Sequence, residues 1–147
     1  MQNEPGSPSA EQLSVTDVVS GSASGPALVL DEPLSLWGGL DALTGIIIDQ
    51  RHPQLGVCLS GTVVFMQSGR GSSSASSVLA EAVRLGTAPA AFVLRELDEI
   101  LALGSFVAAE IYGLVTPVVI TAPDSTFTVS TGDLVRIEPR SLWIGRD

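Results

Sequence analysis

Thr62-Val-Val-Phe-Met66 is a continuous apolar run bounded by Gly61 and by Ser68-Gly69. Such a run is typical of a strand that is covered on both faces. Apolar residues then recur at helical spacing over residues 78–83, and Gly86 is expected to end that helix. The centre of the chain therefore begins with a buried strand followed by an amphipathic helix.

Two further apolar runs continue this pattern. Ala90-Ala-Phe-Val-Leu94 and Pro117-Val-Val-Ile-Thr121 each predict a buried strand. Between them, a helix is expected from about Asp98 to Tyr112, with one apolar stripe made of Ile100, Leu103, Val107 and Ile111. The resulting β-α-β-α-β order predicts parallel strands with right-handed crossovers.

Shorter β segments are expected on both sides of this centre. They cover residues 15–19 and 27–30 before it, and 126–129, 134–137 and 142–144 after it. We therefore expect an α/β domain with an added β layer over residues 13–147, preceded by a flexible tail at residues 1–12. Residues 31–60 form a long irregular stretch in which Gly38-Gly39 suggests that the backbone closely approaches another group.

Composition narrows the classes of function. The chain has 147 residues, of which 45% are hydrophobic and 16% charged, with a mean hydropathy of +0.40. This composition excludes a disordered chain and suits one compact domain. The formal net charge of −9 disfavours nucleic-acid binding. One cysteine and one histidine cannot by themselves ligate an iron–sulfur cluster or a zinc ion.

Residues 100–122 carry a single charge and are long enough to span a membrane. Gly104, Gly113 and Pro117 interrupt them, so a helix, a turn and a buried strand are the favoured interpretation. The N-terminal residues lack the basic and apolar regions of a signal peptide. A cytoplasmic location is therefore expected.

The segment Ser68-Gly-Arg-Gly-Ser-Ser-Ser-Ala-Ser-Ser77 lies between the first buried strand and its helix. Its glycines and the helix N-terminus favour an anion, and Arg70 offers a planar fork for a carboxylate or a phosphate. The alternative is that Ser72–Ser74 only cap the helix and Arg70 is a solvated loop residue. A Walker P-loop is excluded, because its terminal Gly-Lys-Ser/Thr is missing.

Other reactive side chains have simpler interpretations. His52 precedes Pro53 in a loop, so a structural turn histidine is favoured over an acid/base or a metal ligand. Cys58 is interpreted as a small core residue. Trp37 and Trp143 are interpreted as core or interface anchors.

A series of segments, in order from about residue 20 to residue 121, resembles the aconitase X swivel-domain (small-subunit) family. Two departures are Gln67 and Ala42, which stand where the family often has proline. The matching segments are Ser24-Gly-Pro-Ala-Leu28, Glu32-Pro-Leu-Ser35, Trp37-Gly-Gly-Leu-Asp41, Thr44-Gly45, Asp49 with His52-Pro53, Gly69-Arg-Gly-Ser-Ser73, Gly86-Thr-Ala-Pro-Ala90, residues 98–104 and Pro117-Val118.

This resemblance implies the swivelling β/β/α fold of the aconitase superfamily's mobile domain. In the family the swivel domain is either the end of a long chain or a separate small subunit. Because the domain stands alone in this sequence, it looks like the small subunit of a two-subunit hydro-lyase. Its large subunit would hold the cysteines and the iron or iron–sulfur centre, with no metal bound by this chain alone.

The family dehydrates small hydroxy acids. Two stretches, Gly86-Thr-Ala-Pro-Ala-Ala91 and Val107-Ala-Ala-Glu-Ile-Tyr-Gly113, look like the branch that converts cis-3-hydroxy-L-proline to pyrroline-2-carboxylate. The alternative branch dehydrates mevalonate 5-phosphate.

The resemblance also assigns roles to individual residues. It implies that Ser72 is the proton acceptor while hydroxide departs to the large subunit's iron, and that Arg70 holds a substrate carboxylate or phosphate. Further substrate contacts are expected from Gly71, Ser73, Gly38 and Gly39.

A second hypothesis comes from a different class of protein. The same swivelling architecture carries phosphohistidine in phosphotransfer enzymes, so the chain would be a non-catalytic carrier or binding module. His52 is the sole candidate for that role, and it lies outside the Gly-Arg-Gly turn.

Overall fold

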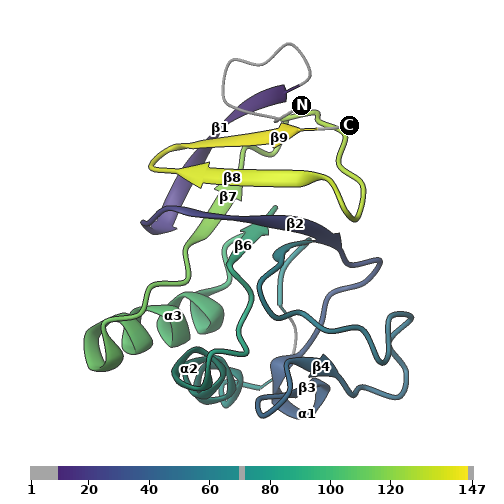
Figure 1. The fold of residues 1–147 in the computed structure, drawn as a ribbon, viewed down its shortest axis with the longest axis vertical. Helices are drawn as coiled ribbons and strands as arrows, with labels where there is room; N and C mark the ends of the chain where they lie inside the picture. Colours follow the sequence, from purple (N-terminus) through teal and green to yellow (C-terminus); the bar gives the residue numbers. More distant parts are fainter. Residues whose placement is uncertain (1–9, 70–71, 146–147) are drawn as a thin grey trace.

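The computed structural model describes residues 10–69 and 72–145 and shows a mixed α/β fold in which strands dominate. Within these residues seven strands close into a barrel in the order β1-β7-β6-β5-β2-β8-β9 (Figure 1). The barrel strands are β1 (Ala10–Val19), β2 (Ala23–Val29), β5 (Val63–Met66), β6 (Ala91–Leu94), β7 (Val118–Thr121), β8 (Leu134–Glu138) and β9 (Ser141–Gly145). The other elements are α1 (Leu36–Gly39), β3 (Leu40–Asp41), β4 (Ile46–Ile47), α2 (Ala75–Leu85) and α3 (Glu99–Tyr112).

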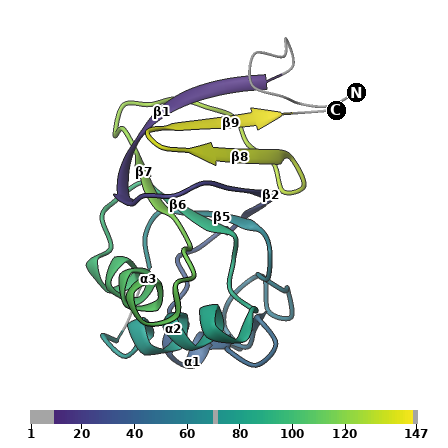
Figure 2. The same cartoon turned by 60° about the vertical axis from the view of Figure 1, so that its left-hand side comes forward.

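One half of the barrel is parallel. Strand β5 pairs with β2 on one side and with β6 on the other, and β6 pairs with β7, all in parallel. The two helices that connect β5, β6 and β7 are in contact with each other and lie on one side of the barrel (Figures 1 and 2). This is the arrangement that the β-α-β-α-β order of the sequence predicts.

The other half of the barrel is antiparallel and closes it. Residues Ala10–Ser14 of β1 pair with β9, whereas Val15–Val19 pair with β7. Residues 10–12, which the sequence assigns to a flexible tail, thus belong to a strand. The alternation explains this, because Leu13 and Val15 are buried while Gln12 and Ser14 are exposed.

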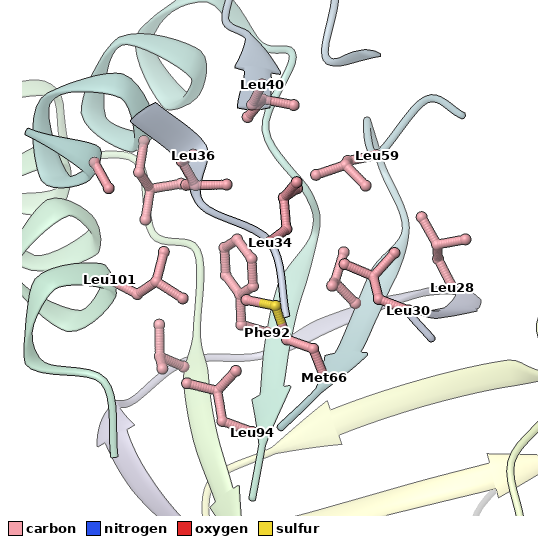
Figure 3. Close-up of a cluster of buried hydrophobic side chains, with 14 of the residues drawn as sticks. Leu28, Leu30, Leu34, Leu36, Leu40, Leu59, Met66, Phe92, Leu94 and Leu101 are labelled. Carbon is pink, nitrogen blue, oxygen red and sulfur yellow. The ribbon is translucent and has the colours of Figure 1, made fainter. Parts of the chain in front are cut away.

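The parallel strands separate two hydrophobic cores. Val64 and Met66 of β5 pack on the helix side, where Phe92 of β6 lies at the centre of the cluster (Figure 3). Val63 and Phe65 of the same strand pack inside the barrel. Four-residue strands buried on both faces therefore read as unbroken apolar runs, which is why the sequence reveals them.

The strand expected at residues 126–129 is absent, and the described backbone there is irregular. The barrel is already closed by the β2–β8 and β1–β9 pairs, so it leaves no free edge for this segment. Phe127 and Val129 pack against the barrel interior instead. The strand expected at residues 27–30 begins earlier than the sequence indicates, because β2 covers Ala23–Val29.

The apolar stripe expected on α3 is wrong for two of its residues, although Ile100 packs against the core. Leu103 and Ile111 are 54% and 65% exposed, whereas the buried residues are Leu101, Gly104, Ser105 and Ala108. Small residues face α2 because the two helices approach closely there.

None of the helices in the described residues is long and apolar enough to span a membrane. Cys58 is exposed, contrary to its expected place in the core, with Sγ 3.6 Å from the Thr44 carbonyl oxygen.

Replacing Gly104 with alanine is expected to destabilise the contact between α2 and α3. A Cβ at this position would lie 2.7 Å from the Ser76 carbonyl oxygen and 3.1 Å from the Leu79 Cβ. Overpacking costs about 1–3 kcal/mol, which exceeds the gain of about 1 kcal/mol that alanine brings to a helix. Urea unfolding should show a lower free energy for Gly104→Ala and little change for Glu110→Ala, an exposed control on α3. An undiminished stability of Gly104→Ala would contradict the close approach.

Candidate active site

A cavity of about 380 Å³ lies where the loops after β5 and β6 lead into α2 and α3. Ligands bind in this position in many α/β proteins, because helix N-termini and loops converge at the carboxyl ends of parallel strands. One wall of the cavity comes from Leu34 and from Leu36, the first residue of α1. The lining residues are Leu34, Leu36, Ser68, Gly69, Ser72, Ala75, Leu97, Asp98, Glu99, Ile100 and Leu101.

Ser72 lines this cavity and is half-buried. Its Oγ accepts a hydrogen bond from the Ser74 backbone N–H at 3.1 Å, and its carbonyl accepts one from the Ala75 N–H at 3.0 Å. Ser72 therefore organises the turn that leads into α2, but it is not the N-cap, which is Ser74 and makes no side-chain capping bond. The bond from the Ser74 N–H leaves the Ser72 hydroxyl proton and a lone pair available. A negative charge on Oγ would keep the Ser74 N–H and lie at the positive end of an eleven-residue helix.

The other expected site residues divide into three groups. Arg70 and Gly71 lie outside the described residues. Ser73 is exposed and does not line the cavity, and its carbonyl accepts from the Ser76 N–H and hydroxyl. Gly38 and Gly39 also do not line the cavity, although Leu34 and Leu36 of the same segment do.

Backbone geometry explains the Gly38-Gly39 pair. Gly38 has φ +78°, a conformation that side-chain-bearing residues rarely adopt. A Cβ on Gly39 would lie 3.1 Å from the Leu34 Cδ1. The pair therefore shapes the segment that presents Leu34 and Leu36 to the cavity, and its contact with substrate stays a prediction.

Asp98 is a cavity residue to which the sequence reasoning gave no role in the site. It caps α3, since its Oδ1 accepts hydrogen bonds from the backbone N–H groups of Ile100 and Leu101, both at 3.0 Å. Its other oxygen lies against Gly69, where a Cβ would be 2.1 Å from Oδ2. An aspartate directly before an apolar helical stretch is the sequence signal that could have identified this cap.

The charges around the cavity are mainly negative. Asp98 and Glu99 line it, and no cationic side chain does so among the residues that the structure describes. An anionic substrate would therefore need positive charge from Arg70, which lies two residues before Ser72 in the sequence, or from another protein chain.

Residues 12–144 match the family described as the aconitase X swivel domain. The chain belongs to this family. It is 48% identical over 101 residues to a cis-3-hydroxy-L-proline dehydratase of Pseudomonas aeruginosa, a match that covers 69% of this chain. The chain spans only 17% of that enzyme's length, and 18% of the length of the Hypocrea jecorina protein of the same name.

Relatives of similar length to this swivel domain also exist. A phosphomevalonate dehydratase small subunit of Methanothrix thermoacetophila is 32% identical over 123 residues, covering 84% of this chain and 85% of that protein. Among solved structures, Thermococcus kodakaraensis aconitase X in its holo form matches with a TM-score of 0.81 and 27% identity. That match covers 92% of this chain and 99% of the solved chain.

His52 of this swivel domain is a structural residue, as the sequence favoured. It is buried, its Nδ1 accepts the Gln54 N–H at 3.1 Å, and its Nε2 lies 3.0 Å from the Glu32 carbonyl oxygen. The Nδ1 bond requires the tautomer that carries its proton on Nε2, which donates to Glu32. Both ring nitrogens are therefore engaged, and neither is free to accept a phosphoryl group or a metal.

The residues present do not fit a metal centre on the described part of this chain. No group of three or more His, Cys, Asp or Glu side chains is placed to hold a metal ion there. Cys58, the one thiol of the chain, does not line the cavity.

Substituting His52 with alanine is expected to cost stability rather than activity. The change leaves the Glu32 carbonyl and the Gln54 N–H without their partners and opens a void, which together cost about 2–4 kcal/mol. Urea unfolding measures this loss, while turnover per folded subunit should change less than about threefold, because His52 lies outside the cavity. A stable but inactive His52→Ala variant would give the histidine a chemical role.

Proposed function

We propose that this swivel domain is the small subunit of an aconitase X-type hydro-lyase whose active site is completed by a large subunit. The observation that carries the proposal is the position of the Ser72 hydroxyl at the cavity, bonded to the backbone N–H of Ser74, the N-cap residue of α2. The family and the similarity to relatives named as small subunits support it. The sequence also led us to expect the swivelling β/β/α fold and a cytoplasmic location, and both belong to the same proposal.

The favoured reaction is dehydration of cis-3-hydroxy-L-proline to pyrroline-2-carboxylate. The 48% identity to the Pseudomonas aeruginosa dehydratase supports this substrate. It exceeds the 41% identity to the Methanothermobacter thermautotrophicus phosphomevalonate dehydratase small subunit. Dehydration of mevalonate 5-phosphate is the alternative. It draws on the 32% identity, over 84% of this chain, to a phosphomevalonate dehydratase small subunit.

Ser72 acts in this proposal as the proton acceptor. The Ser72 hydroxyl first loses its own proton to solvent. The resulting alkoxide takes the proton from the substrate's α-carbon and becomes a hydroxyl again, while hydroxide leaves the neighbouring carbon and a carbon–carbon double bond forms between the two carbons. A serine hydroxyl is a weak base, so its anion needs stabilisation by fixed dipoles. The Ser74 N–H and the α2 N-terminus supply these dipoles.

The remaining substrate contacts follow the sequence predictions. Arg70 pairs with the substrate carboxylate, or with the phosphate in the alternative reaction. Gly71, Ser73, Gly38 and Gly39 provide further contacts. Because Ser73 and the glycine pair do not line the cavity in this structure, their contacts require the large subunit or a closed arrangement.

The large subunit supplies the metal and covers the cavity. We place the iron or iron–sulfur centre on that subunit. Trp37 is 58% exposed directly after the cavity residue Leu36, and the exposed Leu97 lines the cavity. Apolar side chains at a cavity mouth suit contact with a partner.

The carrier hypothesis has little support in the geometry. It requires an accessible histidine, whereas His52 is buried with both ring nitrogens engaged.

A pull-down with the tagged chain under anaerobic conditions tests the proposed function. The eluate is analysed for a second subunit and for iron, then assayed with cis-3-hydroxy-L-proline and with mevalonate 5-phosphate. The proposal expects an iron-bearing partner, turnover of the first substrate and no turnover by the chain alone. Turnover of mevalonate 5-phosphate would select the alternative substrate. An eluate without any partner would contradict the small-subunit role.

A further inference from the structure

A second cavity, of about 180 Å³, lies at the carboxyl ends of β5, β6 and β7. Several of its walls are residues of the barrel's interior core, and none of its lining residues is shared with the cavity at Ser72. We call it the barrel-mouth cavity. The lining residues are Val29, Leu30, Phe65, Met66, Gln67, Val93, Leu94, Arg95, Thr121, Phe127 and Val129.

Thr121 is the first sign that this cavity takes a polar ligand. Its side chain is 1% exposed, and its hydroxyl has no hydrogen-bond partner among the described residues. Buried hydroxyl groups almost always have a partner, because leaving one without a hydrogen bond is unfavourable. A valine, which has the same shape without the hydroxyl, would fill the same space in the barrel core. The unpartnered hydroxyl therefore points to a group that binds from the cavity.

Arg95 supplies the second observation. Its guanidinium carbon lies 4.5 Å from the centre of the Phe127 ring, and its Nη1 donates to the Ser125 carbonyl at 3.2 Å. No carboxylate among the described residues forms an ion pair with it. A guanidinium has five N–H donors, so donors remain for a ligand. Its planar fork matches a carboxylate in particular.

The rest of the cavity suits a small apolar body. Phe65, Val93 and Val129 line it, and Phe127 closes one side with its ring centre 6.2 Å from that of Phe65. The volume corresponds to roughly six water molecules at about 30 Å³ each. This space accepts a short organic acid.

We propose that the barrel-mouth cavity binds a small organic carboxylate with a short apolar body. Arg95 pairs with the carboxylate, Thr121 donates a hydrogen bond to one of its oxygens, and the aromatic and aliphatic walls enclose the body. The segment at residues 122–130 covers the ligand, because Arg95 bonds Ser125 and stacks on Phe127. This inference does not rest on the dehydratase proposal, since it uses neither Ser72 nor a large subunit.

Titration of the full chain, labelled with ¹⁵N, with butyrate at constant ionic strength tests the site by NMR. Butyramide serves as the neutral probe of the same shape. Saturable shifts are expected at Thr121, Phe127 and the Arg95 side chain, with butyramide binding at least about tenfold more weakly, as loss of a charge-assisted hydrogen bond implies. Absence of saturable shifts, or equal binding of the two probes, would overturn the proposal.

Matched variants separate a ligand site from a packing feature. Thr121→Val removes only the hydroxyl, and Arg95→Met keeps the contact with Phe127 but removes the charge. Each is expected to weaken butyrate binding at least about fivefold, whereas Arg51→Gln, the same charge change on an exposed loop, leaves it unchanged. Thr121→Val should also melt at or above the wild-type temperature. Butyrate affinity that neither variant weakens would contradict the assignment.

Discussion

Replacing Ser72 with alanine is expected to lower the turnover of the reconstituted complex by about 10³-fold, within the range that a positioned proton acceptor contributes. The methyl group cannot accept the α-proton, and no other described side chain with a free hydroxyl next to a helix N-terminus lines the cavity at that point. Steady-state kinetics with each candidate substrate measure the effect. The loss should appear in kcat rather than in KM, because the change removes chemistry and little binding.

Two measurements keep this result interpretable. Ser77→Ala removes an exposed hydroxyl from α2, outside the cavity, and should retain wild-type turnover. Ser72→Ala should co-purify with the large subunit in the same amount as wild type, because the hydrogen bond to Ser74 stabilises a turn that the Ser72 carbonyl also holds. Near-normal turnover of Ser72→Ala would reduce the serine to a structural residue of the turn that leads into α2.

Replacing Gly69 with alanine is expected to disturb both stability and activity. The new Cβ would lie 2.1 Å from the Asp98 Oδ2 and 3.3 Å from the Leu101 Cδ1, so the capping carboxylate must move. Loss of an N-cap costs about 1 kcal/mol, and the displaced turn adds strain. Because a shift of about 1 Å in a reacting group can cost 10²-fold in rate, we expect turnover to fall by about that factor.

A double-mutant cycle identifies the cause of that loss. Asp98→Ala alone removes the cap and the atom that the Cβ meets, so adding Gly69→Ala to it should cost less than about 0.5 kcal/mol more. Urea unfolding of the four proteins measures the coupling free energy. Additive effects of the two substitutions would show that the Cβ added at Gly69 does not act through the Asp98 carboxylate.

The central strands could be predicted from the sequence because each is buried on both faces. Val63–Met66, Ala91–Leu94 and Val118–Thr121 are short runs with few polar interruptions, and their parallel pairing follows from the helices between them. The glycines that end α2 and α3 were also informative, since Gly86 and Gly113 adopt φ values of +78° and +69°.

Closure of the barrel and the buried face of α3 could not be predicted in the same way. Closure depends on pairs between distant segments, such as Ala10–Ser14 with β9, which local patterns do not specify. On α3 the apolar residues run almost around the helix, so large aliphatic side chains gave the wrong stripe. Gly104 and Ala108 are buried instead because they allow close contact with α2.

The candidate site was only partly visible in the sequence. Ser72 lies at a cavity, as a chemical role requires, but Asp98 enters the same cavity from a loop about 25 residues further along the chain. The Gly38-Gly39 pair drew attention to the correct segment for a different reason. The conformation of the glycine pair places Leu34 and Leu36 at the cavity, whereas the glycines themselves do not line it.

The most direct test of the account follows the proton itself. The purified complex is given cis-3-hydroxy-L-proline deuterated at the α-carbon, and release of deuterium to water is measured for wild type and for Ser72→Ala at equal amounts of assembled complex. The account predicts release by the wild-type complex and about 10³-fold slower release by Ser72→Ala. Release at the wild-type rate from the assembled Ser72→Ala complex would contradict the claim that this chain supplies the proton acceptor.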